Sequence, residues 1–177
     1  MARRTLIAAL TVVVLMLGVP PAADAVRPAA PPCRPRPHAK CSGANLSRRK
    51  LRGADLHGAD LRGADLSRAD LRRADLRRAN LTQANLFGAD LRGARLDRSK
   101  LVGASFATAQ LGHASFQRAR LTAADLRGTG LQGASFSGAF LTDTNLTGAH
   151  GTSRGVLDRA YYCNTTLPAG DVVLGDC

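Results

Sequence analysis

A five-residue period runs through the sequence without interruption from Ala44 to Ala149. It is clearest between Ala54 and Leu66, where Ala-Asp-Leu recurs every fifth residue. This period fits neither the 3.6 residues of a helical turn nor the two-residue alternation of a strand. The pattern therefore predicts a repeat architecture, in which every unit makes the same local structure.

The residue types within each unit indicate which positions face inward. Leu occupies 18 of the 21 central positions from Leu46 to Leu146, and Phe106, Phe116 and Phe136 occupy the others. Two residues before each central position stands Ala, with four exceptions: Arg49, Ser99, Thr129 and Thr144. A large apolar side chain beside a very small one predicts a narrow, closely packed interior. The other three positions are mostly polar or Gly, and we expect them to face water.

The Ala-(Asp/Asn)-(Leu/Phe)-x-x pattern of residues 44–149 resembles that of the pentapeptide-repeat proteins. The resemblance implies an all-β fold, a right-handed quadrilateral β-helix in which each pentapeptide forms one side and four form a coil. The repeat would then make about five coils, roughly 25 Å of solenoid at ~4.8 Å per coil. Because neighbouring coils stabilise one another by stacking, both ends of such a solenoid need covers.

Residues 1–25 have the features of a secretory signal peptide. Arg3 and Arg4 precede an apolar run from Leu6 to Val19, and Ala23-Asp24-Ala25 provides an Ala-x-Ala cleavage site. The apolar run is too short for a comfortable membrane span. We therefore expect the mature chain to be secreted or extracytoplasmic and to lack a transmembrane segment.

The rest of the chain divides into three parts by composition. Residues 26–43 are rich in Pro and Arg and are interpreted as a semi-rigid leader with an N-terminal cap. We expect residues 44–150 to form the β-helix and residues 151–177 to form a C-terminal cap or tail. The segment from Tyr161 to Gly170 resembles the Cys-Asn-Thr-Thr-x-Pro-x-Gly ending of some exported members of the family. In this chain we expect Tyr161 and Tyr162 to cover the last coil.

The four Cys residues flank the repeat and none falls inside it: Cys33, Cys41, Cys163 and Cys177. In an exported chain an even number of Cys predicts disulfides, and three pairings are open. We favour Cys33–Cys41 and Cys163–Cys177, because the alternatives would have to span the solenoid. The spacings lack the close Cys or His pairs of a structural zinc site, so neither a metal nor a cofactor is expected.

The charge of the chain favours anionic partners. The formal net charge is +12, and removal of residues 1–25 would leave it near +11. Residues 48–100 carry fourteen Arg or Lys and seven Asp, so the first half of the repeat is the basic half. Nucleic acid, anionic lipid or an acidic envelope polymer would each be attracted to such a surface.

A coil of twenty residues would align Arg side chains in columns. One predicted column contains Arg52, Arg72 and Arg92, and a second contains Arg78, Arg98 and Arg118. Closely spaced Arg side chains repel one another unless Asp neighbours, counterions or a polyanion screen them. The two columns are therefore candidate polyanion-binding residues, or alternatively a solvated face. Since Trp is absent and Phe faces mostly inward, no specific nucleic-acid recognition is expected.

Two other functions are disfavoured. Gyrase-binding members of the family imitate DNA in the cytoplasm through an acidic surface, whereas this chain is basic and expected to be exported. A serine hydrolase using Ser153 is suggested by Gly151-Thr152-Ser153-Arg154-Gly155, but the strand and helix that should flank this motif are missing. The sequence thus predicts a non-enzymatic interaction or structural module, and the main alternative is a specific cell-envelope polyanion binder. The expected partner is either an unknown protein or an anionic envelope polymer.

Overall fold

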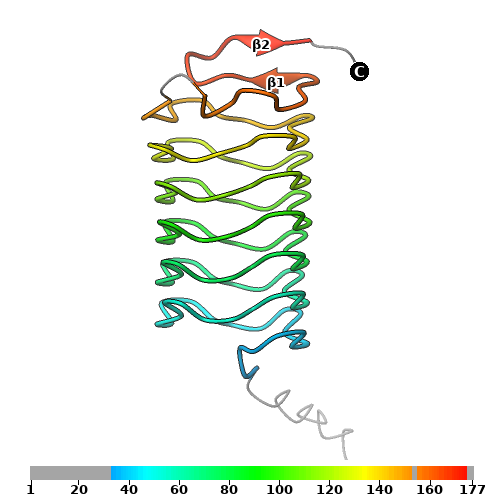
Figure 1. Cartoon of the computed structure of the whole chain (residues 1–177), viewed down its shortest axis with the longest axis vertical. Helices are drawn as coiled ribbons and strands as arrows, with labels where there is room; N and C mark the ends of the chain where they lie inside the picture. Colours follow the sequence, from blue (N-terminus) through cyan, green and yellow to red (C-terminus); the bar gives the residue numbers. More distant parts are fainter. Residues whose placement is uncertain (1–32, 153–154, 175–177) are drawn as a thin grey trace, which may run out of the picture. The chain divides into compact units, whose positions relative to one another are not determined.

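The computed structural model describes residues 33–152 and 155–174 and shows a stack of coils (Figure 1). Residues 1–32, 153–154 and 175–177 lie outside the described part of the chain. The expected signal peptide and Ser153 fall there, and so does the Cys163–Cys177 pairing, because it includes Cys177. Within the described part there is no helix, and the two named strands are β1 (Thr165–Thr166) and β2 (Val172–Val173).

Successive coils are joined by parallel bridges between residues twenty apart. The first bridge joins Lys40 to Asp60, and the series continues at every fifth residue to the bridge from Gly130 to His150. Four pentapeptides therefore complete one coil. The series also shows that the coiled structure begins at about Ala39, one pentapeptide before the repeat is apparent in the sequence.

We number the positions of a unit from 1 to 5, taking Ala54-Asp55-Leu56-His57-Gly58 as the example. The N–H groups of positions 2, 3 and 5 bond to neighbouring coils; Leu56 N–H donates to Asp75 O at 2.8 Å and Gly58 N–H donates to Arg77 O at 2.9 Å. The N–H of position 1 closes the turn of its own chain, as Ala59 N–H does onto Leu56 O at 3.0 Å. Only the position 4 N–H remains, and Asp55 Oδ1 accepts it at 3.1 Å. This explains why Asp or Asn is so common at position 2.

Position 5 forms the corner between two sides and has a positive φ throughout the repeat. Gly53 and Gly58 adopt this conformation without strain, but Arg78, Arg98 and Arg118 adopt it as well, with φ of 57–58°. A positive φ places Cβ close to the backbone of an L-residue, which costs about 1–2 kcal/mol per residue. Arg at a corner is thus a disfavoured choice for the backbone.

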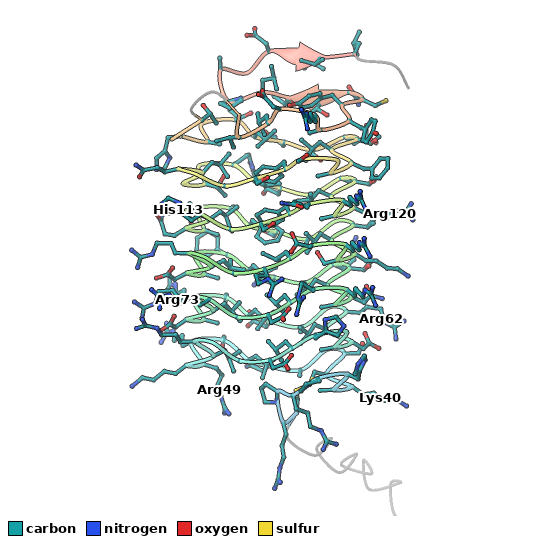
Figure 2. The ribbon with its side chains drawn as sticks, in the orientation of Figure 1. Lys40, Arg49, Arg62, Arg73, His113 and Arg120 are labelled. Atoms are coloured by element: carbon teal, nitrogen blue, oxygen red, sulfur yellow. A yellow bond between two sulfur atoms is a disulfide. The ribbon has the colours of Figure 1, made fainter. Side chains whose placement is uncertain are left out.

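The interior contains the side chains of positions 1 and 3, as the repeat pattern predicted. The central Leu residues from Leu56 to Leu146 and the three Phe residues are fully buried. Phe106 and Phe116 meet edge to face across the same coil, and Phe116 stacks on Phe136 of the next coil with ring centroids 4.7 Å apart. Side chains at the other positions extend outward; Figure 2 shows Arg62 and Arg120 on one side of the stack and Arg73 and His113 on the opposite side.

Cys33 and Cys41 form a disulfide at the N-terminal end of the coils, and this pairing is the one expected from the sequence. Cys41 is buried and takes the central position of the first unit, where later units place Leu. Arg49, which replaces Ala at position 1, is exposed in this first coil. The three other exceptions at position 1 are buried and donate their hydroxyls to backbone carbonyls: Ser99, Thr129 and Thr144.

The C-terminal flank continues the coil after one inserted residue. The bridges from Phe140 to Tyr161 and from Asn145 to Thr166 join residues 21 apart instead of 20. Tyr162 packs partly buried against the core, and its hydroxyl donates to Leu157 O at 2.6 Å. Strand β2 pairs antiparallel with β1 above the coils (Figure 1).

Candidate functional site

Arg side chains of the repeat fall into two groups according to their position in the unit. Arg at position 4 follows position 2 by two residues on the same side of the coil, so an Asp there lies within reach. Five such pairs occur, with the guanidinium Nε and Nη2 both bonded to the carboxylate: Asp60–Arg62, Asp70–Arg72, Asp75–Arg77, Asp90–Arg92 and Asp125–Arg127. Much of the positive charge of the position 4 residues is therefore balanced within the fold.

The paired carboxylates are held in their ionised form. Hydrogen bonds from Arg72 lower the pKa of Asp70 from 3.8 to about 2, against the opposing effect of burial. Arg72 Nε also lies 3.5 Å from Asp90 of the next coil, so this guanidinium is shared between two carboxylates. The pKa values of Asp60, Asp90 and Asp125 are lowered by their Arg partners in the same way.

Arg at position 5 stands at the corner between two sides. Position 2 of the same unit is Asp75 for Arg78, which binds Arg77 instead, whereas the units of Arg98 and Arg118 have no Asp at position 2. Within the described residues, none of Arg78, Arg98 and Arg118 forms an ion pair, and all three are exposed. The two predicted columns therefore differ. Arg72 and Arg92 of the first column are neutralised by Asp70 and Asp90, whereas the second column keeps its full charge.

The second column borders a surface groove of about 760 Å³. We call it the arginine groove and define it by the following residues: His57, Arg77, Arg78, Arg95, Asp97, Arg98, Gln117, Arg118, Ser137, Gly138, Arg159 and Tyr161. It contains six Arg and one Asp. Of the predicted candidates it brings together Arg78, Arg98 and Arg118, and it includes none of Arg52, Arg72 and Arg92.

Small residues make the groove hollow near its C-terminal end. Ser137 and Gly138 form part of its lining, and the side-chain stem of Arg118 packs against Gly138. The Gly138 N–H donates to Arg159 O at 2.8 Å, so Arg159 lies on the far side of this gap. Arg159, which also has a positive φ, thus continues the row of Arg78, Arg98 and Arg118 beyond Gly138.

The one carboxylate of the groove is already engaged. Asp97 accepts hydrogen bonds from the Ser115 hydroxyl and from Gln117 N–H at 3.1 Å. Among the six Arg, Arg77 is bound by Asp75, which leaves five guanidinium groups without an ion pair in the described part of the chain. The groove is thus lined by several charged hydrogen-bond donors and is suited to an anion with several negative groups.

Nine of the twelve residues of the groove were not predicted as site residues from the sequence, among them Arg77, Arg95, Arg159 and Tyr161. Arg95 stands at position 2, where Asp or Asn is usual, and this departure from the pattern was a usable signal. Arg159 follows the inserted residue, so a strict twenty-residue spacing misses it.

Other kinds of site are not evident. Within residues 33–152 and 155–174, no group of three or more His, Cys, Asp or Glu is placed to hold a metal ion. No helix in that part of the chain is long and apolar enough to cross a membrane. His38 and His57 contact each other edge-on with ring centroids 5.7 Å apart. Asp55 binds the backbone N–H of His57, and within the described residues neither imidazole ring is hydrogen-bonded to a carboxylate.

Comparisons with known proteins agree with the coil geometry. The model of the family "Pentapeptide repeats (8 copies)" matches residues 39–78, 79–118 and 114–150. No curated protein sequence matches the chain.

Three similar solved structures illustrate the range of relatives. The pentapeptide repeat protein Rfr23 of the cyanobacterium Cyanothece 51142 is 32% identical with a TM-score of 0.44, over 55% of this chain and 63% of that one. A pentapeptide repeat protein from the thylakoid lumen of Arabidopsis thaliana is 30% identical with a TM-score of 0.41, covering 63% and 69%. HetL of Nostoc sp. strain PCC 7120, involved in heterocyst differentiation regulation, is 28% identical with a TM-score of 0.33, covering 77% and 76%.

The family model covers well over half of the chain, from the first bridged coil to the end of the regular repeat. Pentapeptide repeat proteins fold as right-handed quadrilateral β-helices, and the helix-free stack of twenty-residue coils agrees with that fold. The chain belongs to the pentapeptide repeat family.

Proposed function

We propose that this protein is an exported, non-enzymatic binding module that holds an anionic polymer of the cell envelope in the arginine groove. The observation that carries the proposal is the row of three unpaired Arg side chains at one corner of three successive coils. At ~4.8 Å per coil, these charges form a regular linear array. A flexible polyanion can follow such an array, whereas a small anion would occupy only part of it.

The charge of the row supports a role beyond solubility. Its three guanidinium groups stand on successive coils and repel one another, because no carboxylate of the described chain pairs with them. A bound polyanion offsets the repulsion and releases its own counterions, which favours binding.

Export remains part of the proposal. It is supported by the basic, apolar and Ala-x-Ala features of residues 1–25 and by the Cys33–Cys41 disulfide, since disulfides persist in oxidising compartments. The positive surface also argues against imitation of DNA, which requires a negative one.

The test uses two triple variants with equal changes of charge. The first replaces Arg78, Arg98 and Arg118 by Gln, and the control replaces the corner residues Arg48, Arg68 and Arg73 by Gln. All six Arg are exposed, unpaired within the described chain and at position 5, and Gln83 already occupies that position with φ of 59°. Backbone strain is therefore the same in both variants.

Binding to a labelled heparin oligosaccharide is measured across a series of salt concentrations. We expect the groove variant to lose most of its affinity. The slope of log affinity against log salt concentration should become flatter by roughly one unit per lost contact, the value for a polymer of DNA-like charge density. The control variant should retain the parent behaviour. Equal losses in both variants would indicate diffuse charge and reject the groove, and so would unchanged binding in both.

A further inference from the structure

We infer that the polymer is an acidic polysaccharide with one carboxylate per sugar ring. In this arrangement a sugar ring stacks on Tyr161 while successive carboxylates bind the Arg row. The inference rests on the proposed polyanion function and names the chemical class of the ligand. It is based on a pair of exposed aromatic rings beside the Arg row.

The aromatic pair consists of Phe140 and Tyr161. Their rings stack with centroids 5.0 Å apart and an interplanar angle of 16°. Both are exposed, Phe140 by 45% and Tyr161 by 61%, and Tyr161 lines the arginine groove next to Arg159. Burying this apolar surface under a ligand is favourable. The flat ring and terminal hydroxyl of Tyr suit a ligand that is apolar on one face and polar at its edges, as a pyranose ring is.

The spacing of the Arg row distinguishes sugar acids from simpler polyanions. The row advances by ~4.8 Å per coil. A 1,4-linked pyranose chain advances by a similar distance per ring, so one carboxylate per ring keeps step with Arg78, Arg98 and Arg118. Adjacent phosphates of linear polyphosphate share a bridging oxygen, so their charges lie closer together than the coils of the row and lose register with it.

The geometry of the donors also fits carboxylates. Five Arg residues of this chain already bind Asp carboxylates through Nε and Nη2 together, as Arg72 binds Asp70 at 2.8 and 2.6 Å. The unpaired guanidinium groups of the groove can bind a uronate in the same way. Gln117 and Ser137 lie in the groove among these Arg residues and can bond to ring hydroxyls.

The test compares two probes of matched charge, an oligogalacturonate and linear inorganic polyphosphate, at the same ionic strength. Tyr161→Ser removes the exposed ring, and Phe87→Ser is the control, because Phe87 is 42% exposed and lies outside the groove. The parent protein should bind the oligogalacturonate more tightly than polyphosphate. Tyr161→Ser should lower affinity for the sugar by about tenfold, the equivalent of one stacked ring, and leave polyphosphate binding unchanged.

The outcomes separate this inference from the proposed function. If both probes bind, both depend on Arg78, Arg98 and Arg118, and Tyr161→Ser affects neither or both equally, the polyanion site stands and the sugar inference is rejected. Tighter binding of polyphosphate or of a DNA oligonucleotide would also reject it. If neither probe binds the parent protein, both proposals fail. Thermal unfolding of each serine variant checks that the fold is retained.

Discussion

The side-chain stem of Arg118 lies over Gly138 of the next coil, with Arg118 Cγ 3.3 Å from the position that a Cβ on Gly138 would take. The same relationship joins His113 to Gly133, where the ring would be 2.5 Å from such a Cβ. Corner side chains therefore lean toward the following coil, and a Gly there provides the space. In the arginine groove this space separates Arg118 from Arg159.

Filling that space should impair binding without unfolding the protein. Gly138→Gln adds a side chain to the groove lining and displaces Arg118, so we expect a clear loss of heparin affinity. The matched control is Gly88→Gln, because Gly88 also has a positive φ and lies outside the groove. A Cβ on Gly88 would be 3.6 Å from Arg68 Cγ, so the local packing is similar. Both variants should lose about 1–2 kcal/mol of stability from backbone strain. Equal effects on affinity would contradict a binding role for the gap.

Acid should reduce the stabilisation that the Asp–Arg ion pairs give to the fold. The pKa of Asp70 is about 2 in the folded protein and near 3.8 when unfolded, so its pair with Arg72 stabilises fully above about pH 4 and is lost as pH falls toward 2. We therefore expect Arg72→Gln to melt at a lower temperature than the parent at pH 7 and at nearly the same temperature at pH 2.

Arg73→Gln is the control for this measurement, because Arg73 lies in the same coil, at the corner, without an ion pair in the described chain. Its effect on the melting temperature should not depend on pH. A constant difference between parent and Arg72→Gln from pH 7 to pH 2 would show that the ion pair is not the source of the effect.

The inward assignment of position 3 can be tested with Leu86, which is fully buried. Leu86→Asp places a carboxylate in an apolar interior without a partner, and we expect it to destabilise the protein by several kcal/mol, on the order of 3 or more. Arg73→Ser, on the exposed corner, should change the thermal midpoint little. Similar midpoints for the two variants would refute the assignment.

The core could be predicted from sequence because positions 1 and 3 differ so sharply in size. The exceptions were harder to interpret. Ser99 is tolerated inside because its hydroxyl donates to Leu96 O at 2.6 Å, while Arg49 is tolerated because it is exposed in the first coil. Residue type alone does not separate these two cases, since the difference depends on whether another coil covers the position.

The site was only partly predictable for a related reason. A twenty-residue spacing aligns Arg72 with Arg92 as readily as Arg78 with Arg98, but it does not show which column lies beside a carboxylate. That depends on the turn, which keeps positions 2 and 4 on one side and directs position 5 outward. The inserted residue before Tyr161 likewise shifted Arg159 out of the apparent register.

The Cys33–Cys41 disulfide should protect the first coil specifically. It closes a loop of eight-residue separation, for which chain-entropy estimates give about 2–3 kcal/mol. Cys33→Ser removes it while leaving Cys41 in the core, and we expect faster hydrogen exchange at His38 N–H and Cys41 N–H, which donate to His57 O and Asp60 O. Exchange at Leu91 N–H and Leu111 N–H, in coils far from this end, should be unchanged, because stability in a solenoid is transmitted mainly between neighbouring coils. Peptide mapping of the exported parent should recover Cys33 linked to Cys41. Recovery of Cys33 linked to Cys177, or equal acceleration in all coils, would contradict a local closure of the N-terminal edge.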